Sequence, residues 1–193
     1  AIATAKGRYF SFCDDDDRWP PELGKNLVGA IQAAEAQDTE RMAIVLPFES
    51  RSWCGLSEAP TLKELFLRGV TPPVGSQIYP LDLVKMVNGY NPKVKSGVDH
   101  DLWVRLLPVN PRVAIHWGDG ATVGTDSSES RMTTNVHKRE QGVREALGLW
   151  STTIESTLGA RFLEHFRRSY LGHIYFRFFV DAVRRRQPGV AVS

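Results

Sequence analysis

Four consecutive aspartates at residues 14–17 are the first side chains of the sequence that could carry out chemistry. Carboxylates this close repel one another, so keeping all of them ionised requires a cation or solvent. If the backbone is extended, Asp14 and Asp16 point to the same side. Such a pair could hold a hard divalent ion beside a substrate phosphate. The alternative is a solvated acidic turn that favours the positive N-terminus of a following helix.

A second group with chemical potential is Asp99-His100-Asp101, at the head of a helix expected over residues 97–107. A carboxylate there could act as a general base if it points into a cleft at a substrate hydroxyl. The alternative is structural: Asp99 caps the helix and His100 is merely exposed. Each group taken alone favours its structural alternative, and the two together carry more information.

Strands and helices alternate in the part of the chain that would position these residues. An aromatic strand over residues 8–13 leads into the acidic run, and a helix over 22–36 and an apolar strand over 41–48 follow. This order predicts an α/β fold, in which ligands bind beyond the carboxyl ends of the strands. Farther along, the pattern predicts helices over 61–68, 79–87 and 97–107, a strand over 112–117, and helices from Thr133 onward with a break near Gly159 and a last helix over about 160–186.

The composition is that of one ordinary globular domain. The 193 residues are 42% hydrophobic and 24% charged, which is too apolar for a disordered chain. No apolar run reaches the ~18 residues of a membrane-spanning helix. Cys13 and Cys54 make neither a disulfide framework nor a CxxC zinc pair, which favours the cytoplasm. The net charge of +2 is too small to indicate a nucleic-acid partner.

Three stretches resemble the motifs of glycosyltransferase family 2, whose members have the GT-A fold. Residues 5–19 (AKGRYFSFCDDDDRW) are similar to the family's A-x-G-x-y-i-x-f-x-D-D-D-D-x-W segment. Residues 88–91 (NGYN) and 97–106 (GVDHDLWVRL) are similar to its G-G-[FY]-[DN] and G-E-D-x-D-L-W-x-R-L motifs. Residues 73–76 (PVGS) stand where the family often has a Gly/Ser pair. The resemblance extends from the start of the chain to about residue 107.

The resemblance implies a metal-dependent inverting transferase that moves a sugar from a nucleoside-diphosphate sugar to an acceptor hydroxyl. Asp14 and Asp16 match the DxD pair, so they are expected to hold Mg²⁺ or Mn²⁺ on the diphosphate, as Lewis-acid catalysis requires. Asp14 and Asp15 are expected to bind the donor, Asp15 near its ribose or sugar. Asp99 matches the catalytic aspartate, which removes the proton of the acceptor hydroxyl as general base.

The same resemblance places further residues on the acceptor side, namely His100, Asp101, Trp19, Gly75 and Ser76. Trp103 could also offer a face to a sugar ring, but packing in the core is the favoured interpretation. The expected acceptor is a glycan or a lipid-linked saccharide, as in bacterial polysaccharide biosynthesis.

The sequence departs from the family pattern in three respects. Val98 replaces the Glu that usually precedes the catalytic Asp, which removes a charge beside Asp99. The stretch 123–131 lacks the Arg-x-His whose His can reach the metal. The Gln-x-x-Arg-Trp motif of processive synthases is also missing, which favours the addition of a single sugar.

We expect two parts in the chain. Residues 1–132 would be the C-terminal part of a GT-A domain, a Rossmann-like mixed sheet flanked by helices. The strand-helix-strand unit that opens such a domain and holds the nucleotide is missing, so the chain is expected to be a fragment that could be inactive alone. Residues 133–193 would be a helical extension.

Other interpretations remain open. The last helix, over 160–186, is rich in Arg and carries an aromatic stripe. It could pack on the domain, form a homodimer, or contact the inner face of a membrane peripherally. The chain could accordingly be a catalytically silent binding or oligomerisation module. A nucleotidyltransferase fits poorly, because the Gly-rich phosphate loop expected early in the chain is not seen.

Overall fold

A computed structural model gives the fold of the chain in two compact units. The structure describes residues 2–14, 17–36, 41–46, 60–69, 72, 74–118 and 136–186. The first unit comprises residues 1–91 and 99–126, and the second comprises 92–98 and 127–193. The short segment 92–98 therefore belongs with the C-terminal part of the chain, although it precedes Asp99.

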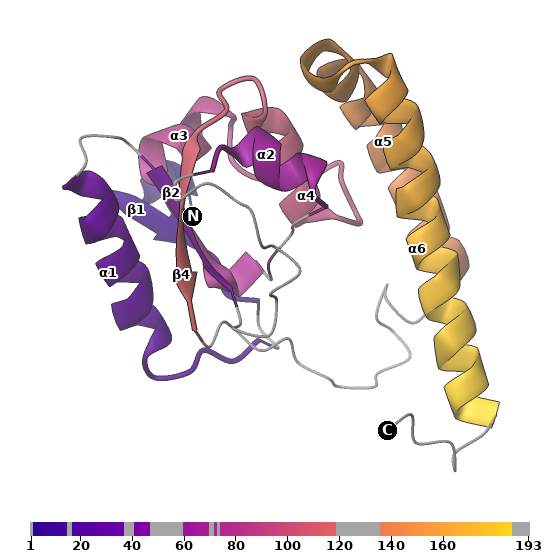
Figure 1. The fold of residues 1–193 in the computed structure, drawn as a ribbon, viewed down its shortest axis with the longest axis horizontal. Coiled ribbons are helices and arrows are strands. Elements are labelled where there is room, and N and C mark those ends of the chain that lie inside the picture. Colours follow the sequence, from indigo (N-terminus) through magenta and orange to yellow (C-terminus); the bar gives the residue numbers. More distant parts are fainter. Residues whose placement is uncertain are drawn as a thin grey trace. The chain divides into compact units, whose positions relative to one another are not determined.

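The first unit is built on a mixed four-stranded sheet (Figure 1). Its strands are β1 (Tyr9–Ser11), β2 (Arg41–Leu46), β3 (Gln77–Pro80) and β4 (Arg112–Trp117), in the spatial order β1-β3-β2-β4. Strand β3 is antiparallel to both β1 and β2, whereas β2 and β4 are parallel and pair from Arg41↔Arg112 to Leu46↔Trp117. The expected mixed sheet is confirmed.

Most of the expected elements are present with small shifts of their ends. The helices are α1 (Leu23–Glu35), α2 (Leu62–Leu67), α3 (Leu81–Met86), α4 (Val98–Leu106), α5 (Val136–Leu158) and α6 (Ala160–Arg186), with 3₁₀ turns η1 (Ile2–Thr4) and η3 (Val74–Ser76). The expected helix over 79–87 is wrong in its first turn. Residues 77–80 form β3, and the helix begins only at Leu81.

Helix α1 covers the sheet through one apolar stripe. Its buried residues lie on one helical face and pack against Ile78 of β3, with Tyr9 and Ala114 partly buried beside them. They are Leu23, Leu27, Ala30 and Ile31. Burying each large aliphatic side chain contributes about 1.5–3 kcal/mol. The stripe therefore fixes α1 on the sheet that carries the candidate site.

Helix α2 secures the start of β4. Thr61 and Glu64 form a capping box at its N-terminus, in which each side chain accepts a hydrogen bond from the other residue's backbone N–H. The backbone N–H of Leu62 donates to the carbonyl of Pro111 at 2.9 Å, and that of Val113 donates to Pro60 at 2.8 Å. Strand β4 is thus tied to α2 by its backbone.

The second unit is a pair of long helices joined at Gly159. This glycine has φ +89°, a left-handed conformation that ends α5 and lets α6 begin. Trp150 of α5 lies against the rings of Phe166 (6.4 Å between centroids) and Tyr170 (5.9 Å) of α6. The first half of the expected aromatic stripe therefore packs between the two helices.

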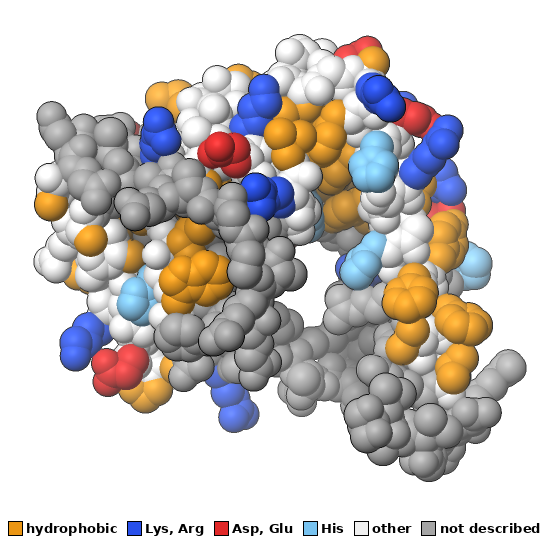
Figure 2. All heavy atoms as spheres, in the orientation of Figure 1, with side chains coloured by type: hydrophobic (Ala, Val, Ile, Leu, Met, Phe, Trp, Pro, Cys, Tyr) orange, Lys and Arg blue, Asp and Glu red, His pale blue; other side chains and the backbone are white. Residues whose placement is uncertain are grey.

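The C-terminal half of α6 carries exposed apolar side chains. Figure 2 shows hydrophobic side chains gathered near this end of the helix, where Tyr175, Phe176, Phe179 and Val183 are exposed. Among the helices within the described ranges, none combines the length and apolar character needed to cross a membrane.

Candidate functional site

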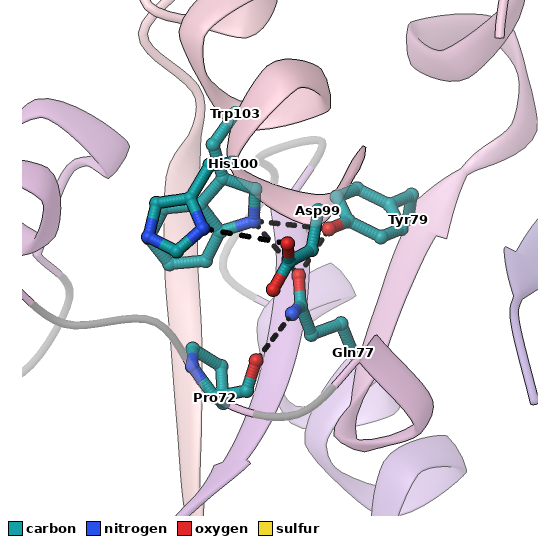
Figure 3. Close-up of polar contacts among 6 residues, drawn as sticks. All are labelled: Pro72, Gln77, Tyr79, Asp99, His100 and Trp103. Carbon is teal, nitrogen blue, oxygen red and sulfur yellow. Dashed lines mark hydrogen bonds and ion pairs between the residues drawn. The ribbon is translucent and has the colours of Figure 1, made fainter. Parts of the chain in front are cut away.

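Asp99 lies in the first turn of α4, at the point where the sequence motif places it. Its carboxylate is 28% exposed, and its Oδ1 lies 3.3 Å from Nδ1 of His100, which is 21% exposed (Figure 3). Both side chains are thus partly accessible. The arrangement leaves Asp99 able to meet a molecule from solvent while His100 contacts it from the side.

The surroundings of Asp99 keep it ionised. Burial is the largest influence and by itself raises the pKa of this carboxyl, because it disfavours the charged form. The hydrogen bond and the charge of His100, together with backbone N–H groups, outweigh burial and lower the pKa below its usual value. Asp99 is therefore a carboxylate at neutral pH, as a general base must be.

A buried polar network lies beneath Asp99 (Figure 3). The indole N–H of Trp103 donates to Oε1 of Gln77 at 2.8 Å and to the hydroxyl oxygen of Tyr79 at 3.0 Å. Tyr79 in turn donates to the same Gln77 oxygen, and Nε2 of Gln77 donates to the carbonyl of Pro72 at 2.7 Å. Trp103 is fully buried, which confirms its packing in the core. The network fixes one face of α4 on β3.

A second anchor holds α4 through Asp101. This carboxylate is 1% exposed and accepts from Nε of Arg105 at 2.8 Å, with Nη2 at 2.7 Å. Nη1 of Arg105 donates to the carbonyl oxygen of Val87, just after α3. The pair therefore joins the face of α4 to the end of α3, and Asp101 is occupied by an internal partner.

The acidic run lies at the end of β1. Asp14 is exposed, and its carbonyl oxygen accepts the backbone N–H of Asp17 at 3.1 Å, so the two ends of the run lie closer than an extended strand would leave them. Asp15 and Asp16, expected to bind donor and metal, lie outside the described residues.

The structure also places three further residues that were expected at the site, Gly75, Ser76 and Trp19. Gly75 and Ser76 are buried in η3, directly before β3. Trp19 is exposed beyond the acidic run. Across the described ranges, no three His, Cys, Asp or Glu side chains gather into a metal site.

Tyr90 connects the two acidic groups. Its ring lies 4.9 Å from that of Phe12, two residues before Asp14. Burial, and then the charges of Asp99 and Asp14, raise the pKa of the Tyr90 hydroxyl, whereas Arg105 lowers it. Both carboxylates thus act electrostatically on one phenol, and the ring contact places Phe12, which follows β1, beside Tyr90.

Sequence reasoning did not single out Tyr90, Gln77 or Tyr79. Tyr90 occupies the aromatic position of the NGYN motif. The one feature of the sequence that could have marked it as a functional residue is the hydroxyl of its side chain. Gln77 and Tyr79 lie in a strand that the periodicity did not reveal.

Comparison with known proteins links this fold to solved structures. No protein-family model and no curated protein matches the chain. Three crystal structures of S. aureus TarS resemble it: TarS 1-349 (TM-score 0.56, 15% identity), TarS 1-349 in complex with UDP (0.54, 18%) and TarS (0.52, 15%).

The matches cover 100%, 100% and 92% of this chain but only 52%, 53% and 29% of the TarS chains. The chain therefore spans about half of the length of TarS 1-349 and less of the longer chain. At this identity the likeness concerns the fold alone. The chain has a fold that resembles part of TarS 1-349.

Proposed function

We propose that the chain is part of a metal-dependent inverting glycosyltransferase, which moves a sugar from a nucleoside-diphosphate sugar to an acceptor hydroxyl. The observation that carries the proposal is the partly exposed, ionised carboxylate of Asp99, which acts on the same tyrosine hydroxyl as Asp14, on a fold shared with TarS. The GT-A motifs around both aspartates support the same reaction, including the assignment to family 2.

Asp99 acts as the general base. Its carboxylate takes the proton of the acceptor hydroxyl while the acceptor oxygen bonds to the anomeric carbon. The bond from that carbon to the diphosphate breaks on the opposite side, and the diphosphate leaves with the electron pair. A lowered pKa keeps Asp99 deprotonated, and the contact with His100 orients it.

The donor set of the acidic run fits Mg²⁺ or Mn²⁺, since carboxylate oxygens are the ligands that these hard cations prefer. Asp14 and Asp16 would hold the ion, and it would neutralise the charge that grows on the leaving diphosphate. Asp14 is exposed at the end of β1 and is therefore accessible to a diphosphate. Asp15 would contact the ribose or the sugar of the donor.

A uridine nucleotide is the first donor to try, because one TarS structure contains UDP. A saccharide or lipid-linked acceptor would approach from the side of Asp99. There His100, Trp19, Gly75 and Ser76 are the proposed contacts, and Asp101 would shape this side through its pair with Arg105.

Turnover measurements test this function. The complete natural protein that contains the chain is assayed for metal-dependent transfer from UDP- and GDP-sugars. Asp99→Asn is expected to lower kcat by about 10²–10⁴-fold, the usual value of a general base. Asp16→Ala is expected to abolish the metal-dependent turnover. Asp82→Asn, an exposed aspartate of α3, is the matched control and should leave turnover unchanged. Full turnover by the Asp99 and Asp16 variants would refute these roles.

A second candidate function is a silent binding or oligomerisation module. The exposed Tyr175, Phe176 and Phe179 of α6 favour it, because apolar patches of this kind often mark interaction sites. This function requires wild-type protein that binds no donor in calorimetry yet forms a stable dimer or sediments with anionic vesicles. Metal-dependent donor turnover would reject it.

A further inference from the structure

One face of α6 is apolar and yet exposed. Phe176, Phe179 and Val183 follow one another at spacings of three and four residues, so they form a single stripe along the helix. Their exposed fractions are 66%, 65% and 41%. Figure 2 shows hydrophobic side chains gathered near this end of the helix. We call these three residues the α6 stripe.

The α6 stripe is not the face that packs against α5. Leu163 and Ile174 of α6 are buried, and the rings of Phe166 and Tyr170 lie against Trp150 of α5. At about 100° per residue, these four residues of α6 lie on the side of the helix roughly opposite the α6 stripe. The helix therefore has one apolar face that α5 covers and a second that it leaves exposed.

The sequence around the α6 stripe is strongly basic. Residues 175–186 contain four arginines, Arg177 and Arg184 to Arg186, against the single acidic residue Asp181, which gives a net charge of +3. A helix that combines exposed aromatic side chains with a cluster of arginines is typical of helices that lie in the headgroup region of an anionic membrane. Charge and apolar character thus indicate the same kind of surface.

A second copy of the chain fits the α6 stripe poorly. A stable protein interface buries about 800 Å² on each partner, and three partly exposed side chains supply less than that. Two copies that met through this face would also bring together two segments of net positive charge, which repel. A lipid surface needs no matching shape, and anionic headgroups strengthen binding by about fivefold for each basic residue held near them.

We propose that the α6 stripe docks on an anionic phospholipid bilayer. Phe176 and Phe179 enter the headgroup region, and the positive charge of residues 175–186 holds the helix end at the surface. The inference goes beyond the proposed function and does not depend on it. For a lipid-linked acceptor, such a contact would keep the protein at the surface that carries its substrate.

Vesicle binding tests the inference. The complete natural protein that contains the chain is sedimented with phosphatidylcholine vesicles that contain or lack phosphatidylglycerol. The wild type is expected to bind only the anionic vesicles, and more weakly at high salt. Phe176→Gln/Phe179→Gln should weaken this binding by at least about tenfold, because two rings no longer leave water. The matched control Met86→Gln/Leu149→Gln changes two other exposed apolar side chains, in α3 and α5, and should bind like the wild type.

Two further variants separate charge from insertion. Arg184→Gln/Arg185→Gln/Arg186→Gln should lower the affinity for anionic vesicles by about 10²-fold, or about fivefold for each arginine. Phe179→Trp keeps an aromatic ring and adds a fluorophore to the α6 stripe. Its emission should shift to the blue with anionic vesicles by more than that of the wild type. This reading does not require the Gln variants to fold.

The remaining outcomes would overturn the inference. Wild-type protein that binds neither kind of vesicle, or both equally, would exclude an anionic bilayer as the partner. Undiminished binding by Phe176→Gln/Phe179→Gln would place the contact elsewhere in the protein. A concentration-dependent oligomer that dissociates in this variant would assign the α6 stripe to a protein interface. Sugar transfer enters none of these measurements, so turnover decides the proposed function separately.

Discussion

The contact between His100 and Asp99 sets the proton affinity of the proposed base. Burial alone raises the pKa of Asp99, and His100 is the main group that reverses this effect. In His100→Leu the burial is no longer opposed by this contact, so the pKa of Asp99 rises. A base loses activity as the pH falls through its pKa, and the acid limb of the kcat/KM profile should therefore move to higher pH. The pH profile of turnover measures the shift.

His100→Gln serves as the companion variant, because its amide can still donate to the carboxylate. Its acid limb is expected between those of the wild type and His100→Leu. An acid limb that stays in place in both variants would separate His100 from the ionisation of Asp99, whatever happens to the maximal rate.

Residue positions differ in how far a sequence can foretell them. The placement of Asp99 in the first turn of α4 was predictable, because spacing, the preceding Gly97 and the preference of acidic side chains for the first turn of a helix all agree. Asp101 was expected at an acceptor, yet it is buried against Arg105 four residues later. An Asp and an Arg four residues apart can pair on any helix. Whether the carboxylate instead meets a ligand depends on how the helix packs in the fold. The nearness of Tyr90 to Phe12 depends on two loops meeting, which no local pattern encodes.

Helix α4 is held on β3 by hydrogen bonds as well as by packing. In Trp103→Phe the indole N–H is lost, and Gln77 and Tyr79 each lose a bond in a fully buried setting. The free energy of unfolding is expected to fall by about 1–3 kcal/mol, the cost of leaving buried polar groups unsatisfied. Urea denaturation followed by circular dichroism gives this value.

The matched control is Trp19→Phe, the same change at an exposed position. Its effect on stability is expected to stay within about 0.5 kcal/mol. An equal decrease in the free energy of unfolding in the two variants would show that the hydrogen bonds of Trp103 to Gln77 and Tyr79 do not contribute to stability.

The elements with regular periodicity were predictable, and the short buried strand was not. Helix α1 shows its apolar stripe at helical spacing, and the apolar residues of β2 mark a strand. Strand β3 has only four residues, all buried, and includes Gln77 and Pro80. Its sequence shows no alternation of polar and apolar residues, because both faces of the strand are covered. Its polar residue is accommodated by Trp103, which lies 26 positions away in the chain.

At the scale of the whole molecule, the chain crosses between its two units immediately before the proposed base. Residues 92–98 belong with α5 and α6, and Asp99 belongs with the sheet. The sequence predicted a single boundary near residue 132, because a helical pattern begins there. The segment 92–98 has only seven residues, which is too short to be recognised from composition or periodicity.

Gly97, in the segment 92–98, lies close to side chains of α5 and α6. It has φ +77°, and a Cβ there would lie 2.8 Å from Oη of Tyr170 and 3.1 Å from Cη2 of Trp150. Gly97→Ala is expected to destabilise the protein by more than about 1 kcal/mol, because it adds left-handed strain to a steric clash. Since Asp99 follows two residues later, kcat should fall as well. Thermal unfolding and turnover measure the two effects.

Gly148→Ala in α5 is the matched control. This glycine is helical and a Cβ meets nothing within 4 Å, so the change should stabilise the protein by about 0.5–1 kcal/mol. The double variant Gly97→Ala/Tyr170→Phe removes the nearest clashing atom and should recover part of the loss, leaving the backbone strain in place. If the double variant recovered nothing, Tyr170 would not be the group that confines Gly97. If Gly97→Ala kept both Tm and kcat, the helical pair would have no part in holding the segment that leads to Asp99.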